Sequence, residues 1–297
     1  RAQEAGLPLL YEAACCAGIP IIRNLEEYYT NDVLKGLHGI VNGSTNYILS
    51  QMTVNGLAFA KALQQAQAAG FAEEDPTQDI GGEDAANKLT ILLAHAWGIT
   101  GQKPLYCGID KIHPADAKLA ADRGQCIKLV ARAKRLPNGN IAAFVLPQFT
   151  NQQARIAGIH NEFNAVEIEG SLDTQFFSGR GAGGFPTASA VLSDLQALRY
   201  NYQYDYQKLN NASAQLTDDF YLKVCISYRS LLHVRHEDFV RIDEWISTEN
   251  RCHISGIIHS STLTGNWWKS GETSLIVYED WLLSPESVTT KWQEVVI

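Results

Sequence analysis

The sequence predicts an α/β (α+β) protein in which helices cover a mixed β-sheet and a smaller βαββα(β) unit follows. Strand-like and helix-like segments alternate over the first 205 residues. A polar, Tyr- and Asn-rich stretch then interrupts the apolar pattern, and the length of 297 residues suits two domains. We therefore expect domains at 1–205 and 218–297, joined by a linker at 206–217.

The first part of the chain supports this prediction element by element. The apolar run 7–22 is typical of a strand broken by small residues, and 36–41 is typical of a strand that leads through a turn into a helix at 45–52. Such junctions expose backbone N–H groups that suit anionic ligands. A short helix follows and ends at Gly70, and a stronger helix covers 84–97.

Later segments continue the alternation. We expect a helix and a strand within 108–136, a strand at 141–149, a strand pair at 165–172 and 174–179, and a glycine loop that enters a helix. In the last unit we expect strands at 220–228, 252–261 and 273–280, and helices at 237–248 and 285–296.

Composition excludes several classes of function. A formal net charge of -8 argues against a nucleic-acid partner, because phosphate backbones select clustered Lys and Arg. No run approaches eighteen apolar residues and no signal peptide opens the chain, so we expect no membrane partner. The six cysteines form no CxxC pair and the histidines no HExxH motif, which favours reduced thiols in a cytoplasmic protein over a zinc site.

The stretch "GFAEEDPTQDIGGEDAANK" contains six carboxylates and ends on Lys88. On a helix, Asp84 and Lys88 are an i,i+4 pair at the border of an apolar stripe. One interpretation is an acidic cap with a surface ion pair that contributes a few tenths of a kcal/mol. The other is a partly desolvated lysine whose pKa is lowered for use as a general acid or base. A divalent metal is a third, but the D-x-D-x-D-G spacing of a calcium loop is missing.

The run "GRGAGG" at 179–184 satisfies G-x-G-x-x-G literally and precedes a helix. A dinucleotide-binding fingerprint also needs a complete βαβ unit, which is not evident after this late match. We expect a glycine loop that lies against a phosphate or ribose held mainly by another segment.

Three stretches, "YEAACCAGIPII", "GIVNGSTNYILSQM" and "GFAEEDPTQDIGGEDAANKL", resemble the catalytic region of homoserine dehydrogenases in order and spacing. The resemblance continues through "IKLVARA", "FNAVEIEG" and "GRGAGGFPTASAVLSDL". It implies a catalytic and dimerisation domain in a homodimer. It also implies NAD(P)H-dependent interconversion of L-aspartate 4-semialdehyde and L-homoserine, on the route to threonine, methionine and isoleucine.

The resemblance also implies roles for single residues. Lys88 matches the proton donor to the carbonyl oxygen, and the substrate-binding positions are Glu73, Asp79, Asp84, Ser44 and Thr45. Glu73 and Asp84 match carboxylates that bind the substrate, Asp79 supports them, and the two hydroxyl residues line the pocket. These residue types suit the chemistry, because an ammonium needs carboxylates and a developing alkoxide needs an acid.

Two further sites follow from the resemblance. Glu12 and the backbone carbonyls of Cys15, Ala17 and Ile19 match a site for a monovalent cation, usually sodium. Here Cys15-Cys16-Ala17 replaces the family's usual Val-Ala/Gly-Gly run, which alters the local packing. Gly181 and Gly183 match a loop that approaches the nicotinamide end of NADP or NAD.

The chain also departs from the family pattern. The family's N-terminal Rossmann domain is absent, so we expect no measurable NADP binding and no turnover by this chain alone. The last unit resembles an ACT domain, although "YRSLLHVRHEDF" replaces the usual Asp-x-Pro-Gly-Val-Leu turn. The alternative hypothesis is a non-catalytic amino-acid-sensing or interaction module derived from the same family.

Overall fold

The computed structural model describes residues 5–30, 32–210, 214–229, 234–248, 251–265 and 272–283. The α-helices are α1 (Ile21–Glu27), α2 (Gly43–Asn55), α3 (Phe59–Ala68), α4 (Thr77–Ile80), α5 (Glu83–Trp97), α6 (Pro114–Asp122), α7 (Gly184–Leu198) and α8 (Gln207–Asn210). The strands are β1 (Gly36–Ile40), β2 (Leu105–Tyr106), β3 (Gln125–Arg135), β4 (Ile141–Asn151), β5 (Phe163–Glu169), β6 (Thr174–Arg180), β7 (Leu216–Thr217), β8 (Tyr221–Tyr228), β9 (Phe239–Ser247), β10 (Cys252–His259) and β11 (Ser274–Leu283). Short 3₁₀ turns lie at Glu12–Ala14, Tyr28–Thr30, Arg155–Gly158, His236–Asp238 and Ser260–Gly265.

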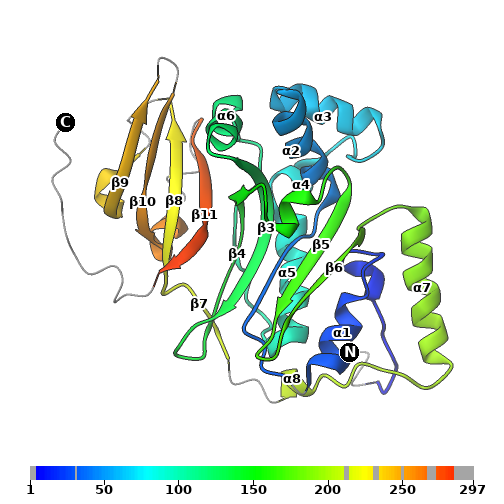
Figure 1. Cartoon of the computed structure of the whole chain (residues 1–297). Helices are drawn as coiled ribbons and strands as arrows, with labels where there is room; N and C mark the ends of the chain where they lie inside the picture. Colours follow the sequence, from blue (N-terminus) through cyan, green and yellow to red (C-terminus); the bar gives the residue numbers. More distant parts are fainter. Residues whose placement is uncertain are drawn as a thin grey trace.

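The strands of the described residues form one 11-stranded sheet in the order β6-β5-β1-β3-β4-β11-β8-β10-β9, with β2 and β7 paired to β4. Most neighbours are antiparallel, whereas β2, β7 and β11 each run parallel to β4. The sheet is therefore mixed, as the sequence predicts. Helices α2 and α5 pack on strands β3, β4 and β5, and α7 lies at the edge of the molecule beyond β6 (Figure 1).

Strand β4 joins two hydrophobic cores. Its residues Ala143, Val145 and Phe149 belong to the larger core beneath the helices, whereas Phe144 and Leu146 belong to a second core with β8, β10 and β11. Successive side chains of a strand point to opposite faces, so β4 is buried on both sides. This explains why its sequence is a continuous apolar run.

Most predicted elements are confirmed. The strand, turn and helix expected over 36–52 are β1 and α2, the helix ending at Gly70 is α3, and the helix expected over 84–97 is α5. The later helix and strands are α6, β3 and β4, and the predicted strand pair is the antiparallel pair β5–β6. The glycine loop enters α7 as expected.

The strand expected over 7–22 is wrong. This segment is a 3₁₀ turn and an irregular loop, and its last two residues open α1. Most of its apolar residues from Cys15 to Ile22 are buried, whereas Leu7 and Leu9 are exposed. Cys16 adopts a positive φ of 56°, and a Cβ on Gly18 would lie 2.8 Å from the carbonyl oxygen of Arg180. The apolar pattern therefore reflects the burial of a compact turn and does not indicate an extended strand.

The helix expected over 237–248 is also wrong, because this segment forms edge strand β9. Its apolar residues Phe239, Ile242 and Ile246 have helical spacing, which misled the prediction. Irregular register against β10 shifts the alternation, and a Cβ on Gly256 of β10 would lie only 2.2 Å from the Arg241 carbonyl oxygen. The expected βαββα order thus fails at its first helix, and the second, 285–296, lies outside the described residues.

The polar, Tyr-rich stretch 199–217, which includes the expected linker 206–217, takes part in the larger core. It includes α8 and β7, and Tyr204 is buried while Tyr202 and Tyr206 pack against the same core. The division into domains at 1–205 and 218–297 stays a prediction. No helix within the described ranges is long and apolar enough to cross a membrane.

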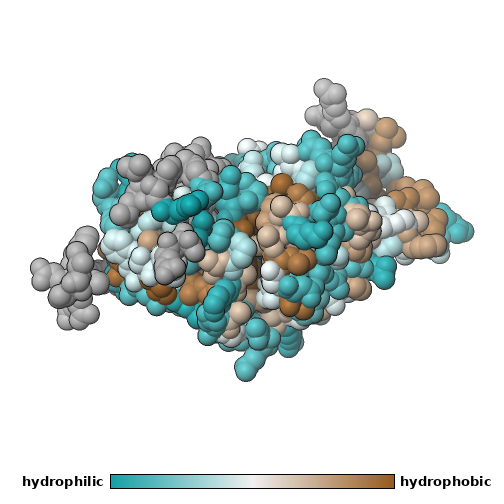
Figure 2. All heavy atoms as spheres, turned by 90° about the horizontal axis from the view of Figure 1, so that it is seen from above, coloured by the Kyte–Doolittle hydropathy of each residue, from teal (hydrophilic) through white to brown (hydrophobic). Residues whose placement is uncertain are grey.

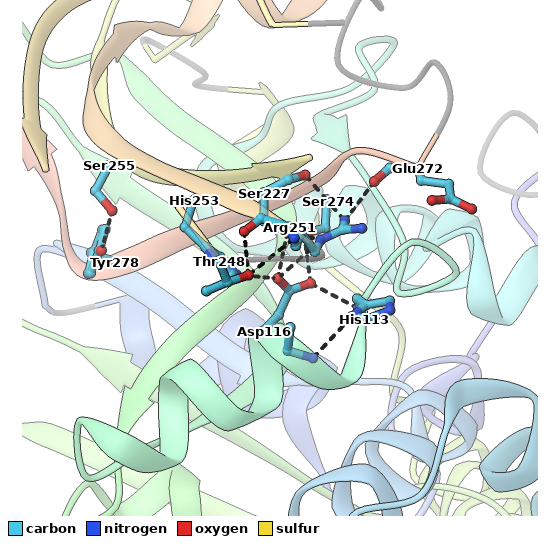
Figure 3. A network of polar contacts seen from close by, with 11 residues as sticks. His113, Asp116, Ser227, Thr248, Arg251, His253, Ser255, Glu272, Ser274 and Tyr278 are labelled. Atoms are coloured by element: carbon cyan, nitrogen blue, oxygen red, sulfur yellow. Dashed lines mark hydrogen bonds and ion pairs between the residues drawn. The ribbon is translucent and has the colours of Figure 1, made fainter. Parts of the chain in front are cut away.

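A buried polar network connects α6 to the C-terminal strands (Figure 3). Asp116 accepts hydrogen bonds from Ser227 of β8 at 2.5 Å, His253 of β10 at 3.0 Å and Ser274 of β11 at 2.8 Å. Arg251 donates to the Ser227 hydroxyl at 2.6 Å. Burial raises the pKa of Asp116, but the hydrogen bonds from His253 and Ser227 outweigh burial and hold that pKa below its ordinary value. One ionised carboxylate therefore ties three strands to α6.

Candidate active site

Lys88 is the centre of a polar cluster at the start of α5. Its Nζ donates to Asp84 Oδ2 at 2.7 Å and to the carbonyl oxygen of Val41 at 3.1 Å. Asp84 lies in the first turn of α5 and Lys88 one turn later, which is the predicted i,i+4 pair. The two side chains are 19% and 30% exposed, so the pair is half-buried and remains accessible to a small ligand.

The ionisation state of Lys88 follows from its neighbours. Burial lowers the pKa of the Lys88 ammonium, but the charge and hydrogen bond of Asp84, with the thiols of Cys16 and Cys15, raise that pKa above its ordinary value. The interpretation of Lys88 as a lysine with a lowered pKa is therefore wrong. The ammonium form predominates at neutral pH, so Lys88 is suited to donate a proton.

Asn42 brings the carboxylates of the cluster together, and the sequence analysis missed it. Its side-chain oxygen accepts from Thr45 N at 2.9 Å, which caps the N-terminus of α2. Its Nδ2 donates to Asp79 Oδ1 at 2.7 Å and to Asp84 Oδ2 at 2.8 Å. An Asn directly before "GSTN" at a helix start is a capping signal that the sequence shows. Its role as a bridge between the two carboxylates could not be predicted, because it depends on where α4 lies.

The other residues predicted to bind the substrate differ in their contacts and exposure. Asp79 joins the cluster through Asn42. The Ser44 hydroxyl donates to the Phe71 carbonyl oxygen at 2.6 Å, and the buried Thr45 hydroxyl bonds Asn42. Both hydroxyls therefore stabilise the turn. Glu73 is exposed, and its backbone carbonyl accepts from a side chain of α3. The geometry thus brings together Asp79, Asp84 and Lys88, whereas the exposed side chain of Glu73 makes no hydrogen bond to them.

The remaining carboxylates of the acidic stretch lie on the surface. Glu83 forms an ion pair with Lys103 at 2.8 Å, with both side chains about two-fifths exposed. Asp75 accepts from the Thr77 hydroxyl at 2.5 Å, and this hydrogen bond holds the pKa of Asp75 below its ordinary value. The surface interpretation of the stretch therefore holds for these residues, whereas Asp84 and Lys88 are half-buried.

Glu12 is buried and closes the N-terminus of α1. Its carboxylate accepts from the backbone N–H groups of Ile22 at 2.7 Å and Arg23 at 2.9 Å. Burial raises the pKa of Glu12, partly offset by these two hydrogen bonds and the charge of Arg23. The backbone N–H of Glu12 donates to Asp194 of α7 at 3.0 Å. The turn after Glu12 is thus fixed between α1 and α7.

The donor set of this turn fits a hard monovalent cation. Within the described residues, the carbonyl oxygens of Cys15 and Ala17 accept no hydrogen bond of normal geometry, whereas that of Ile19 accepts from Ile21 N at 2.8 Å. A buried carboxylate with free carbonyls nearby is the chemistry that such an ion needs. The thiol of Cys15 contacts the Lys88 carbonyl at 3.7 Å, so this turn also lies beside α5.

The glycine loop is explained partly by packing. A Cβ on Gly181 would lie 1.9 Å from the side-chain nitrogen of Asn164, so this glycine is needed whether or not a cofactor binds. Gly183 adopts a φ of 111°, which favours glycine, and a Cβ on Gly184 would meet no atom within 4 Å. The backbone at 183–184 is therefore open to the approach of a flat ring.

Together, the mixed sheet and this cluster define a class of protein: an α/β protein with a half-buried lysine–carboxylate cluster at the start of a helix. The homoserine dehydrogenase family model matches residues 20–196. The chain is 38% identical over 204 residues to the homoserine dehydrogenase of Bacillus subtilis, covering 68% of this chain and 47% of that protein. The chain belongs to the homoserine dehydrogenase family.

Solved structures agree with this assignment. A homoserine dehydrogenase from Thiobacillus denitrificans superposes with a TM-score of 0.77 at 30% identity, over 94% of this chain and 72% of that one. A hyperthermophilic archaeal homoserine dehydrogenase mutant in complex with NADPH gives 0.57 at 29% identity, over 69% and 59%. The first match extends well beyond residues 20–196, so the C-terminal strands belong to a known arrangement. The chain spans about half the length of the curated relatives it matches.

Proposed function

We propose that this chain supplies the substrate-binding and proton-donating part of a homoserine dehydrogenase. The reaction interconverts L-aspartate 4-semialdehyde and L-homoserine with NADPH or NADH, in the biosynthesis of threonine, methionine and isoleucine. The observation that carries the proposal is the Lys88 ammonium bonded to Asp84 at 2.7 Å, beside Asp79 and Asn42. The family match supplies the identity of the substrate.

The residues of the cluster divide the chemistry between them. The nicotinamide cofactor, when bound, supplies the hydride that reduces the aldehyde carbon. Lys88 donates a proton to the aldehyde oxygen, on which negative charge develops. Asp84 keeps Lys88 in its ammonium form and binds the substrate together with Glu73, which takes the α-ammonium, and Asp79 supports these two carboxylates. If one of these side chains lost its charge, a charged group of the substrate would be left without a partner.

We propose further that Glu12 and the carbonyls of Cys15, Ala17 and Ile19 hold a sodium ion, and that Gly183 contacts the nicotinamide end of NADP or NAD. The open backbone at 183–184 supports the second assignment. The outer face of α7 exposes Phe185, Val191, Leu192 and Leu195, and apolar surface gathers at that end of the molecule (Figure 2). Such a face suits contact with a further part of the enzyme.

We also propose a cytoplasmic homodimer. The dimer is the arrangement that the family resemblance implies. The six cysteines all have free thiols, and burial raises the pKa of Cys15, Cys16, Cys126 and Cys225, which suits a reducing compartment.

A pair of lysine variants tests the catalytic role. In the full-length enzyme, we expect Lys88→Met to lower kcat by 10²–10⁴-fold, the range typical of a lost general acid, while the cofactor Kd stays near the wild-type value. Lys103→Met is the matched control, because Lys103 also pairs with a carboxylate of α5 at 2.8 Å but on the surface. If Lys88→Met turned over as fast as Lys103→Met, Lys88 would have no part in proton transfer.

Binding to the chain alone, combined with turnover by the full-length enzyme, separates the enzyme from the sensing module. We expect titration calorimetry to show L-homoserine binding that Asp79→Asn weakens and Glu83→Gln leaves unchanged. Turnover by the full-length enzyme that contains this chain would support the catalytic role. Binding without turnover in that enzyme would favour the amino-acid-sensing module instead.

A further inference from the structure

A hydrogen-bonded relay runs across the base of α5, two turns beyond Lys88. His95 is 1% exposed and contacts Tyr11 Oη through Nε2 at 2.6 Å and Glu26 Oε1 through Nδ1 at 2.5 Å. The Tyr11 hydroxyl and Nε2 of His95 thus share one short hydrogen bond. The imidazole then donates from Nδ1 to the carboxylate of Glu26.

The aromatic segment 202–206 closes this relay from solvent. Tyr204 packs edge-on against the rings of Tyr11 and His95, with centroids 5.0 and 5.1 Å away. Its hydroxyl accepts from Tyr11 N at 3.4 Å, and the backbone N–H of Tyr206 donates to Glu26 Oε2 at 3.2 Å. The polar composition that makes this segment resemble a linker therefore supplies the hydroxyls and rings of a lid.

The relay ends next to the turn proposed to hold sodium. Tyr11 precedes Glu12 in the chain, and Glu26 lies on α1, whose N-terminus the Glu12 carboxylate caps. The turn is thus held from α5 through Tyr11 and the Cys15 thiol, from α1 through its own carboxylate and from α7 through Asp194. Of its two attachments to the helix that carries Lys88, the contact of Tyr11 with His95 at 2.6 Å is the shorter.

We propose that His95 is a positioning residue for the cation-binding turn. Through Tyr11 it fixes where the Glu12 carboxylate and the following carbonyls lie relative to α5, and the lid 202–206 keeps this contact dry. The inference rests on the cation site of the proposed function. It assigns a role to His95, Tyr11 and Glu26, none of which touches the substrate.

Two measurements on the whole chain test the proposal: ²³Na NMR relaxation for sodium binding, and amide hydrogen exchange over residues 12–22. Tyr11→Phe removes one hydroxyl and keeps the ring. We expect it to weaken sodium binding and to speed exchange in this turn, each roughly 2- to 10-fold, as the loss of one buried hydrogen bond implies. His95→Gln, which can keep only one of the two hydrogen bonds, should act in the same direction.

Tyr29→Phe is the matched control. The Tyr29 ring is buried, and its hydroxyl also makes one hydrogen bond, to Gln175 at 2.8 Å, but away from His95. If Tyr11→Phe matched Tyr29→Phe in both measurements, the proposal would be overturned. Absence of sodium binding by the unaltered chain would refute the cation site itself. In that case, the rate of amide hydrogen exchange in the turn would still show whether His95 and Tyr11 hold the turn in place.

Discussion

Replacing Asn42 tests whether one carboxamide assembles the active-site cluster. The side chain performs two tasks at once: its oxygen caps α2, and its nitrogen bridges Asp79 and Asp84 at 2.7 and 2.8 Å. Asn42→Ala removes both tasks. Asn42→Ser restores the cap, since Ser is as good a capping residue as Asn, but its short hydroxyl cannot reach two carboxylates.

The expected costs follow from this geometry. Loss of the cap costs about 1 kcal/mol of unfolding free energy. A hydrogen bond to a charged group contributes about 1.5–3 kcal/mol when buried. Here one nitrogen donates to both carboxylates and Asp84 is 30% exposed. We therefore expect the two hydrogen bonds together to contribute only about 1–2 kcal/mol to the free energy of unfolding. We therefore expect losses of about 2–3 kcal/mol for Asn42→Ala and about 1–2 kcal/mol for Asn42→Ser.

Urea unfolding of the intact chain, followed by circular dichroism, measures these differences as shifts in the midpoint at constant slope. Asn55→Ala is the control on the same helix, because the exposed Asn55 makes a surface hydrogen bond to Gln51, and its cost should stay within about 0.5 kcal/mol. Stability of Asn42→Ser equal to that of the unaltered chain would refute the bridging role and leave only the cap.

Two further predictions concern buried positions. Because the folded-state pKa of Asp116 lies below its unfolded value of 3.8, its contribution is complete above that value and is lost as the pH falls through the folded pKa. Asp116→Asn should lower the free energy of unfolding by about 3 kcal/mol at neutral pH and remove this part of the loss of stability in acid. Urea unfolding at several pH values measures both effects, and an unchanged dependence of stability on pH would contradict the prediction. Gly181→Ala should cost about 1–3 kcal/mol by overpacking against Asn164, whereas Gly184→Ala, whose Cβ meets open space, should unfold like the unaltered chain in the same assay.

Much of the part that matches the family model could be predicted because its signals are local. The i,i+4 spacing of Asp84 and Lys88, the turn before α2 and the alternation of strands with helices all act within a few residues of each other. The mixed sheet predicted from them is confirmed. The assignment of roles to Glu12, Glu73 and Gly183 came from the family resemblance and stays a prediction.

The errors occur where distant partners decide the structure. The apolar spacing of β9 is helical, and only its pairing with β10 makes it a strand. The tyrosines at 202–206 lack apolar periodicity, yet a buried histidine from α5 gives them a place in the core. Neither partner can be identified from the local pattern of these segments.

The two lysine–carboxylate pairs of α5 show why spacing alone could not decide the chemistry. Lys103–Glu83 and Lys88–Asp84 have nearly the same length, 2.8 and 2.7 Å. The first pair is open to water, which weakens it to a surface interaction. In the second, Asp84 also accepts from Asn42 and Lys88 also donates to a backbone carbonyl, so both charges are held in one orientation. A third partner, and not the pair itself, distinguishes this fixed lysine–carboxylate pair from an ordinary surface ion pair.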